Sequence, residues 1–230
     1  MLTAAEANEA ILAAMPAALI ESVPVAAAAG RVLRQSVKAE RDQPPFDRVT
    51  MDGITLAYSE FAQGARKFPI QAMQAAGDPA LKLEPGKAIE IMTGASLPEG
   101  ADCVVPVERI LARDGVAEIE AGYVAEERQF IHARGSDHPK DTTLLTPGVR
   151  ISPLDIAVIA SCGLSTVATS KWPAVRVIST GNELVPAGEP IQPHQIRMSN
   201  GPALVAMLGQ HGFNDCVHDH IVDDPDLLED

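Results

Sequence analysis

Hydroxyl and carboxylate side chains follow two short apolar stretches near the end of the sequence. STGNE (179–183) comes directly after one stretch, 174–178, and Asp223 comes after the other, 216–222. If both stretches are parallel strands of one sheet, their carboxyl ends meet at one edge, and Glu183 and Asp223 lie close together. Paired carboxylates at such an edge suit Mg²⁺, which takes oxygen ligands and bridges to phosphates.

Neutral donors accompany these carboxylates. The hydroxyls of Ser179 and Thr180 and the backbone N–H of Gly181 could donate hydrogen bonds to a phosphate or another oxyanion. A purely structural alternative stays open for the second strand end. There, Asp-Asp-Pro (223–225) would only begin a further helix, with an aspartate as cap and the proline in the first turn.

Three other loops carry polar residues between apolar runs. They are FDRVTMDG (46–53), MTGASLPEGADCVV (92–105) and RGSD (134–137). Asp-Gly, and the proline pair before FDRVTMDG, are ordinary turn signals. Thr93 follows a predicted strand directly, so its hydroxyl and backbone N–H are well placed for an anion. Each loop alone is a weak signal, because loops are usually polar.

Composition narrows the class of protein. The 230 residues suffice for two small domains, or for one with a large insertion. The net charge is −13 and no run of Lys or Arg occurs, which disfavours nucleic acid as a partner. We find no signal peptide and no apolar stretch of membrane-spanning length. Three widely spaced cysteines without a CxxC motif indicate reduced thiols in a cytoplasmic protein.

Helix signals stand at both ends of the chain. Thr3 and Glu6 form a capping box, and Pro16 ends the helical periodicity. A second short helix or turn is predicted over 25–33. Ser152 is the expected cap of a helix over 153–162, which is apolar almost all round and therefore expected to be buried.

The segment between these helices has the sequence pattern of β-structure. A strand is predicted over 88–92, and a hairpin over 110–119 with Asp114-Gly115 at its tip. This β-rich block covers about 41–140. After it, a strand at 174–178, a helix through 203–208 capped by Ser199-Asn200, and a strand at 216–222 make one βαβ unit. One such unit leaves sheet edges uncovered, so we expect a piece of a longer protein or dependence on a partner.

The histidines and cysteines favour no metal or nucleophilic site. His218 and His220 would share one face of a strand, but no zinc-type spacing surrounds them, and a solvated edge strand is the preferred interpretation. His132 and His138 flank RGSD and are interpreted in the same way. The cysteines are interpreted as packing residues.

Taken in order, several segments of this chain resemble the MoeA family, the molybdenum insertases of molybdenum cofactor biosynthesis, which include the gephyrin E domain. The resemblance covers essentially the whole chain. The segments are AAGRVLRQSV (28–37), PPFDRVTMDG (44–53), IEIMTGASLPEGADCVV (89–105), RGSD (134–137), LTPGVRISPLDIAVIASCGL (145–164), VRVISTGNEL (175–184) and IVDDP (221–225).

The resemblance implies a multidomain α/β plus β fold. Residues 1–40 and 141–173 would form a helical and β shoulder domain, interrupted by a β-rich lid domain at 41–140. Residues 174–230 would begin a parallel α/β, molybdopterin-binding domain. Family members are homodimers whose cleft forms between the α/β domain of one subunit and the lid of the other.

The family reaction inserts molybdate into adenylylated molybdopterin, with a divalent cation such as Mg²⁺, and releases AMP. A molybdopterin adenylyltransferase is a further implied partner. Carried over by motif, the catalytic residues are Asp52, Thr93, Asp137, Glu183 and Asp223. Asp52, Glu183 and Asp223 would hold the metal, and the ligand-binding loop would be Ser179, Thr180 and Gly181. Carboxylates would hold Mg²⁺ rather than the anions directly, while Thr93 would donate to oxyanions.

The chain departs from the family pattern at several positions. Arg48 interrupts the usual FDNSAMDG and could bind an anion or pair with Asp47. Asn182 stands in the usual GDE, and Met198 in the usual DTN or DSN. The SGGVS and PGNP segments and the C-terminal barrel are absent, so this chain alone is expected to be inactive. A non-catalytic dimeric scaffold, or a generic phosphate-binding α/β protein with an unrelated lid, are the alternatives.

Overall fold

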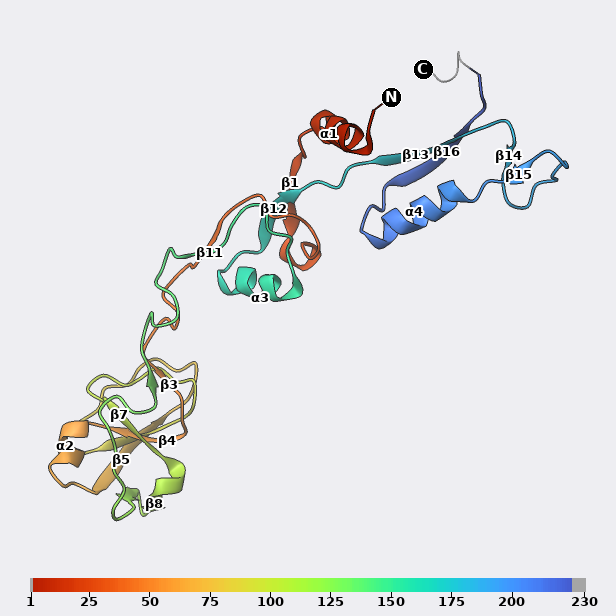
Figure 1. The fold of residues 1–230 in the computed structure, drawn as a ribbon. Helices are drawn as coiled ribbons and strands as arrows, with labels where there is room; N and C mark the ends of the chain where they lie inside the picture. The colour runs from red at the N-terminus through yellow and green to blue at the C-terminus, as the bar shows by residue number, and fades with distance from the viewer. Residues whose placement is uncertain (1, 225–230) are drawn as a thin grey trace. The chain divides into compact units, whose positions relative to one another are not determined.

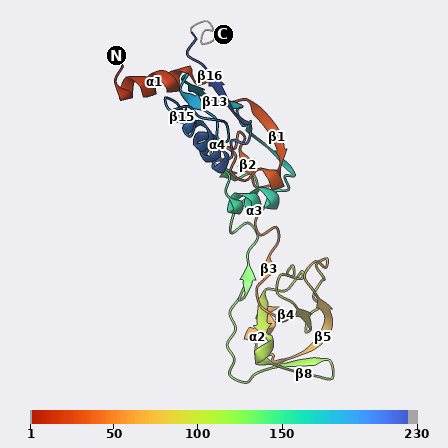
Figure 2. The same cartoon turned by 90° about the vertical axis from the view of Figure 1, so that its right-hand side faces the viewer.

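The computed structural model describes residues 2–224, which form two compact units. One, here called the β-rich unit, combines Val37–Leu145 with Ser161–Gly163. The other, here called the α/β unit, contains the remaining residues. Figures 1 and 2 show the elements of each unit from two directions. The predicted mixture of helices and strands is present. The finer division into shoulder, lid and molybdopterin-binding domains stays a prediction.

The β-rich unit is built on one six-stranded sheet. Its strand order is β7-β4-β6-β5-β9-β8, and every pair is antiparallel except β5 with β6. The strands are β4 (Gly53–Leu56), β5 (Lys67–Gln74), β6 (Ala88–Ile91), β7 (Cys103–Pro106), β8 (Ile110–Arg113) and β9 (Val116–Ile119). The predicted hairpin is confirmed as β8 and β9, with positive φ angles at Asp114 and Gly115.

Short elements complete this unit. They are the strands β2 (Val37–Lys38), β3 (Arg48–Val49), β10 (Ile131–His132) and β11 (Thr143–Leu145), the helix α2 (Tyr58–Ala62) and the 3₁₀ turn η2 (Val107–Arg109). β2 pairs with β11 and β3 with β10, both antiparallel. Each pair therefore joins backbone that is far apart in sequence.

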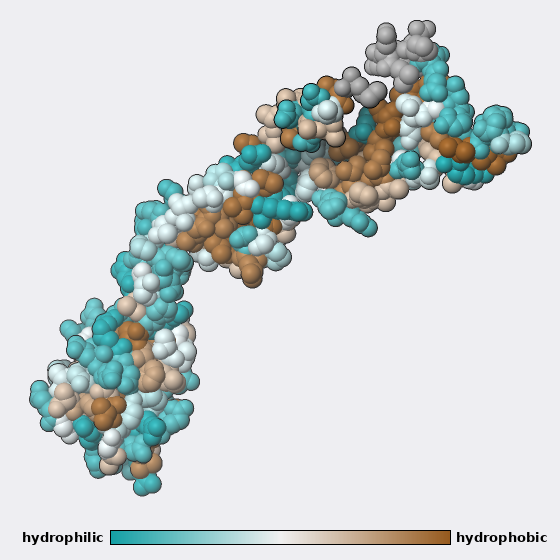
Figure 3. All heavy atoms as spheres, in the orientation of Figure 1, coloured by the Kyte–Doolittle hydropathy of each residue, from teal (hydrophilic) through white to brown (hydrophobic). Residues whose placement is uncertain are grey.

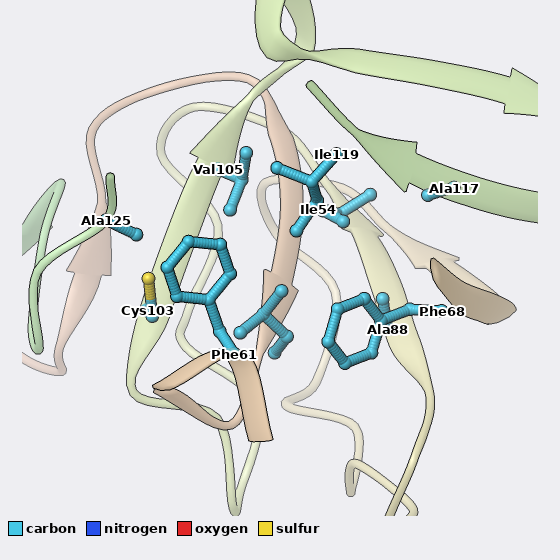
Figure 4. Close-up of a cluster of buried hydrophobic side chains, with 10 residues drawn as sticks. Ile54, Phe61, Phe68, Ala88, Cys103, Val105, Ala117, Ile119 and Ala125 are labelled. Carbon is cyan, nitrogen blue, oxygen red and sulfur yellow. The ribbon is translucent and has the colours of Figure 1, made fainter. Parts of the chain in front are cut away.

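The core of the β-rich unit combines aliphatic side chains with two phenylalanines, Phe61 and Phe68. Phe61 of α2 packs with Ile54 of β4 and Val105 of β7, and Figure 4 shows these side chains pointing toward one another. A second cluster on the other side of the same strands contains Val49 and Val104. β4 and β7 are thus buried on both faces and give a stable base for the loops at their ends.

The α/β unit begins with the predicted capped helix α1 (Ala4–Ala14). Its capping box between Thr3 and Glu6 is confirmed, and the helix ends before Pro16. β1 (Ile20–Pro24) then pairs antiparallel with β12 (Thr166–Ser170). The helix or turn expected over 25–33 reduces to a 3₁₀ turn, η1 (Val25–Ala27), because the next residues bond to other segments.

The helix α3 (Pro153–Ser161) is capped as predicted but is not buried all round. Ser152 and Asp155 exchange hydrogen bonds of 2.8 and 3.2 Å at its start. Ile159 is fully buried, whereas Leu154 is 80% exposed. Only one side of α3 packs within the described residues, and Figure 3 shows apolar surface over this helix. Its all-round apolar sequence therefore does not translate into all-round burial.

The predicted βαβ unit is confirmed at the end of the chain. β13 (Val175–Thr180) pairs in parallel with β16 (Cys216–Ile221), and α4 (Asn200–Gln210) lies between them in sequence. A second small parallel pair, β14 (Leu184–Val185) and β15 (Ile196–Arg197), was not predicted. Ser199 occupies the cap position of α4, but its side chain makes no capping hydrogen bond. The helix suggested at Pro225 lies outside the described residues.

Apolar side chains stay exposed on this βαβ unit. Ile178 of β13, Met207 of α4 and Val217 of β16 are each about half exposed. Among residues 2–224, no helix combines the length and apolarity needed to cross a membrane.

Candidate functional site

The three polar loops predicted in the β-rich unit meet in the structure. Val49, in FDRVTMDG, accepts and donates backbone hydrogen bonds with the MTGAS segment, including Val49 N–H to Ala95 O at 2.9 Å. On its other side, Thr50 N–H donates to Phe130 O at 3.0 Å, and β3 pairs with β10 just before RGSD. FDRVTMDG is therefore the middle member of the group, with the apolar Val49 cluster beneath it.

Asp52 and Thr93 form the most exposed contact of this group. Asp52 Oδ1 accepts two hydrogen bonds from Thr93, one from the backbone N–H at 2.6 Å and one from the hydroxyl at 2.7 Å. These bonds, the backbone one first, lower the pKa of Asp52, so the carboxylate is ionised at neutral pH. Both side chains are exposed.

This geometry differs from the expected role of Thr93. Both donors of Thr93 are used by Asp52, so neither is directed at an oxyanion in this conformation. The Thr93 hydroxyl oxygen keeps its lone pairs, and Asp52 Oδ2 accepts no hydrogen bond within residues 2–224. The pair therefore presents acceptor oxygens, which suit a hard cation better than an anion.

Gly53 permits this arrangement. A Cβ at position 53 would lie 1.9 Å from the backbone oxygen of Val105, so only glycine lets β4 approach β7 this closely. The glycine thus holds Asp52 at the end of a buried strand.

Asp47, by contrast, fastens the neighbouring loop. Its Oδ1 accepts from Arg134 N–H and its Oδ2 from Arg128 Nη2, both at 2.8 Å. Asp42 adds a bond from Arg134 Nε at 2.7 Å and one from Lys140 N–H at 2.9 Å. The Arg134 N–H bond is the largest cause of the lowered pKa of Asp47. These two carboxylates order RGSD, a role that the sequence did not indicate.

Asp137 is held by a histidine. Arg48 Nη2 lies 3.1 Å from His132 Nδ1, and His132 Nε2 lies 3.0 Å from Asp137 Oδ1. A guanidinium can only donate, so Nδ1 accepts and the network assigns the ring proton to Nε2, which donates to Asp137. Arg48 therefore contacts His132 instead of Asp47, which corrects one expected pairing. His132 is not the solvated side chain that we expected.

The strand ends of the α/β unit also meet. Asp223 N–H donates to Asn182 Oδ1 at 3.1 Å, and Gly181 N–H donates to Ile221 O at 3.4 Å. Glu183 folds back over Gly181, since a Cβ on Gly181 would lie 2.4 Å from its Oε2. The departure at Asn182 thus joins the two loops that carry the predicted carboxylates.

No group of three His, Cys, Asp or Glu side chains gathers closely enough to hold a metal within the part of the chain that the structure describes. Asp52 belongs to the β-rich unit, whereas Glu183 and Asp223 belong to the α/β unit. A metal site built from all three is therefore not a property of either unit taken alone.

A cleft of about 270 Å³ opens beside the carboxyl end of β13. Ser179 and Thr180 line it from the strand, and Asn200 and Gly201 line it from the start of α4. Backbone N–H groups at a helix start and neutral hydroxyls are ordinary ligands of phosphates. Two of the three residues predicted for ligand binding thus border a cleft.

The histidines of β16 face this region. His218 Nε2 lies 2.9 Å from Ser179 Oγ, and His220 Nε2 lies 2.8 Å from Gly181 O. His218 is partly buried, so a solvated edge is the wrong interpretation for it. The two-residue spacing of the histidines indicated that they share one face of a strand. It did not identify their partners, which lie 39 residues away in sequence.

The protein combines a β-rich inserted unit, in which three polar loops meet, with an α/β unit that carries a cleft at a strand end. A family model described as the MoeA N-terminal region, domains I and II, matches residues 2–163. The chain therefore belongs to the MoeA family.

Named relatives agree with this assignment. A molybdopterin molybdenumtransferase of Synechocystis is 35% identical over 229 residues, which cover 99% of this chain and 59% of that protein. One of Bacillus subtilis is 33% identical over 192 residues and covers 79% and 44%. A crystal structure of a molybdopterin biosynthesis MoeA protein from Pyrococcus horikoshii superposes with a TM-score of 0.82 at 30% identity, covering 96% and 57%. The chain spans about half the length of these relatives.

Proposed function

We propose that the protein to which this chain belongs inserts molybdate into adenylylated molybdopterin and releases AMP. The observation that carries the proposal is the meeting of three motif loops in a chain of the MoeA family. FDRVTMDG contacts MTG through Asp52 and RGSD through Asp47.

Asp52 and Thr93 would act on a divalent cation. Asp52 Oδ2 and the lone pairs of Thr93 Oγ1 are adjacent oxygen acceptors, and such a donor set fits Mg²⁺. When bound, Mg²⁺ would supply charge neutralisation at the phosphoanhydride and at molybdate. Asp137, which His132 orients, would add a second carboxylate to that of Asp52 on this side of the site.

The cleft beside β13 would hold the phosphates of the adenylylated substrate. Ser179 and Thr180 would donate to the phosphate oxygens without adding charge, whereas the N–H of Gly181 is used by Ile221 O. Glu183 and Asp223 would bind the same cation from this side, since their loops are joined through Asn182.

The complete site would form in a homodimer, with the β-rich unit of one subunit facing the α/β unit of the other. Such a dimer would bring together Asp52 with Glu183 and Asp223, which belong to different units. A molybdopterin adenylyltransferase would supply the adenylylated substrate, and the reaction would run in the cytoplasm, in line with free cysteines.

The test is molybdate-dependent AMP release by the full-length product of the gene, with Asp52→Asn as the variant and Glu127→Gln as the matched control. Glu127 is an exposed carboxylate of the same unit that makes no hydrogen bond in residues 2–224. We expect the first variant to lose at least tenfold in rate and the second to keep it. A wild-type protein that binds the substrate but never releases AMP would instead favour the dimeric scaffold.

A further inference from the structure

One hydrogen bond beside the β13 cleft is not used in the proposed chemistry. Ser179 borders the cleft, and its Oγ lies 2.9 Å from Nε2 of His218 on β16. His218 does not line the cleft itself. Within residues 2–224, its one side-chain hydrogen bond to the candidate ligand-binding loop is to the serine hydroxyl.

The position of the His218 ring is fixed by close packing. His218 is paired in register with Val177 on the parallel strand β13. Its ring also lies against the first turn of α4, where a Cβ on Gly201 would come within 1.9 Å of Nε2. Glycine at 201 therefore leaves the space that the ring fills beside Ser179.

The direction of this hydrogen bond decides what Ser179 offers to a ligand. A hydroxyl has one proton and two lone pairs. If Nε2 accepts the proton, Ser179 shows only lone pairs to the cleft and repels an anion. If Nε2–H donates, the serine proton stays free to donate to a phosphate oxygen.

We propose that His218 is a positioning residue, whose Nε2–H donates to Ser179 Oγ and thereby turns the serine proton toward an anionic ligand in the β13 cleft. This inference rests on the proposed function, because it assumes that phosphate oxygens occupy the cleft. His218 itself touches no substrate. It acts through Ser179 alone, and that dependence makes the inference testable.

The test combines two measurements on the 230-residue chain. The first is the affinity for inorganic pyrophosphate, measured for wild type, His218→Leu and His218→Gln, each with and without Ser179→Ala. Leucine removes the donor at similar bulk, and glutamine keeps a side-chain N–H. The second is an NMR measurement of the ring-nitrogen shifts of His218 and the side-chain couplings of Ser179.

We expect His218→Leu to weaken pyrophosphate binding roughly fivefold, the value of one hydrogen bond, and His218→Gln to restore most of it. In the Ser179→Ala background, His218→Leu should cost nothing further. A merely structural histidine would weaken binding equally in both backgrounds, and that result would overturn the inference. Unchanged affinity of His218→Leu would overturn it as well.

The NMR data separate this inference from the function on which it rests. A proton on Nε2, with one Ser179 rotamer that becomes averaged in His218→Leu, supports positioning even if no variant binds pyrophosphate. In that case the phosphate assignment of the cleft fails instead. An unprotonated Nε2, or a Ser179 rotamer unaffected by His218→Leu, contradicts positioning whatever the affinity.

Discussion

Replacing Asp47 by alanine should loosen the loop that carries RGSD and its Asp137. The change removes the acceptor of Arg134 N–H and of Arg128, both at 2.8 Å. A hydrogen bond to a charged group contributes about 1.5 to 3 kcal/mol. The Arg128 side chain is 48% exposed, so its ion pair adds at most about 1 kcal/mol. The sum is a loss of about 2 kcal/mol, which would lower the melting temperature of the β-rich unit by roughly 10 °C.

The chain provides separate spectroscopic probes for this measurement. Both tyrosines, Tyr58 and Tyr123, lie in the β-rich unit, and the single tryptophan, Trp172, lies in the α/β unit. The tyrosine signal of Asp47→Ala should melt early while the tryptophan signal stays at its wild-type temperature. Glu127→Ala, which deletes a carboxylate without hydrogen bonds, is the control. An unchanged tyrosine transition in Asp47→Ala would refute the claim that this carboxylate fastens the loop.

Three further predictions concern the β-rich unit. Gly53→Ala should destabilise the β-rich unit by about 3 kcal/mol in urea unfolding, because the new Cβ would lie 1.9 Å from Val105 O. A loss smaller than about 1 kcal/mol would show that β4 can shift to make room for the methyl group. Asp42 and Asp47 have pKa values below the ordinary 3.8, chiefly through backbone N–H donors, so their stabilisation is complete above pH 3.8 and is lost as the pH falls below it. Unfolding at pH 5 and pH 3 measures this, and Asp47→Ala should lose less than wild type over that step. Cys103, whose pKa burial raises to about 12, should resist iodoacetamide at pH 8 until the protein unfolds; rapid labelling of the native protein would contradict its burial.

The sequence predicted well where the structure is decided locally. The capping boxes at Thr3 and Ser152 depend on side chains three residues apart, and both form. The hairpin at 110–119 depends on Asp114-Gly115, whose positive φ angles suit the turn. Alternation and turn signals also located β13, α4 and β16. In the capping boxes and the hairpin turn the interacting groups are close in sequence, so their residue types alone carry the information.

The contacts that organise the candidate site are long-range, and the sequence did not reveal them. Asp47 bonds to Arg134 across 87 residues, and Arg48 contacts His132 across 84. Nothing in the local pattern distinguishes Asp47, which fastens a loop, from Asp52, which is exposed at a strand end. The prediction that α3 is buried all round was wrong for a related reason. The sequence of a helix that is apolar all round does not show which of its faces packs against a neighbour.

The sequence predicted which motif residues to consider, but not the hydrogen-bond partners of their side chains. Thr93 was expected to donate to an anion, whereas both of its donors are used by Asp52. Such a choice depends on angstrom-scale geometry that residue types do not encode. The structure therefore replaces an expected oxyanion donor by a pair of oxygen acceptors.

The most direct test of the central claim, a site shared between the β-rich unit of one subunit and the α/β unit of the other, is complementation between two inactive variants. Asp52→Asn and Glu183→Gln, each made in the full-length product of the gene, should both abolish molybdate-dependent AMP release. In a random mixture of the two, half of the dimers combine both variants, and each of these has one intact site if the sites are shared. The account predicts recovery of about a quarter of wild-type activity in the mixture. Activity that stays at the level of the separate variants, with mixed dimers demonstrated, would contradict it.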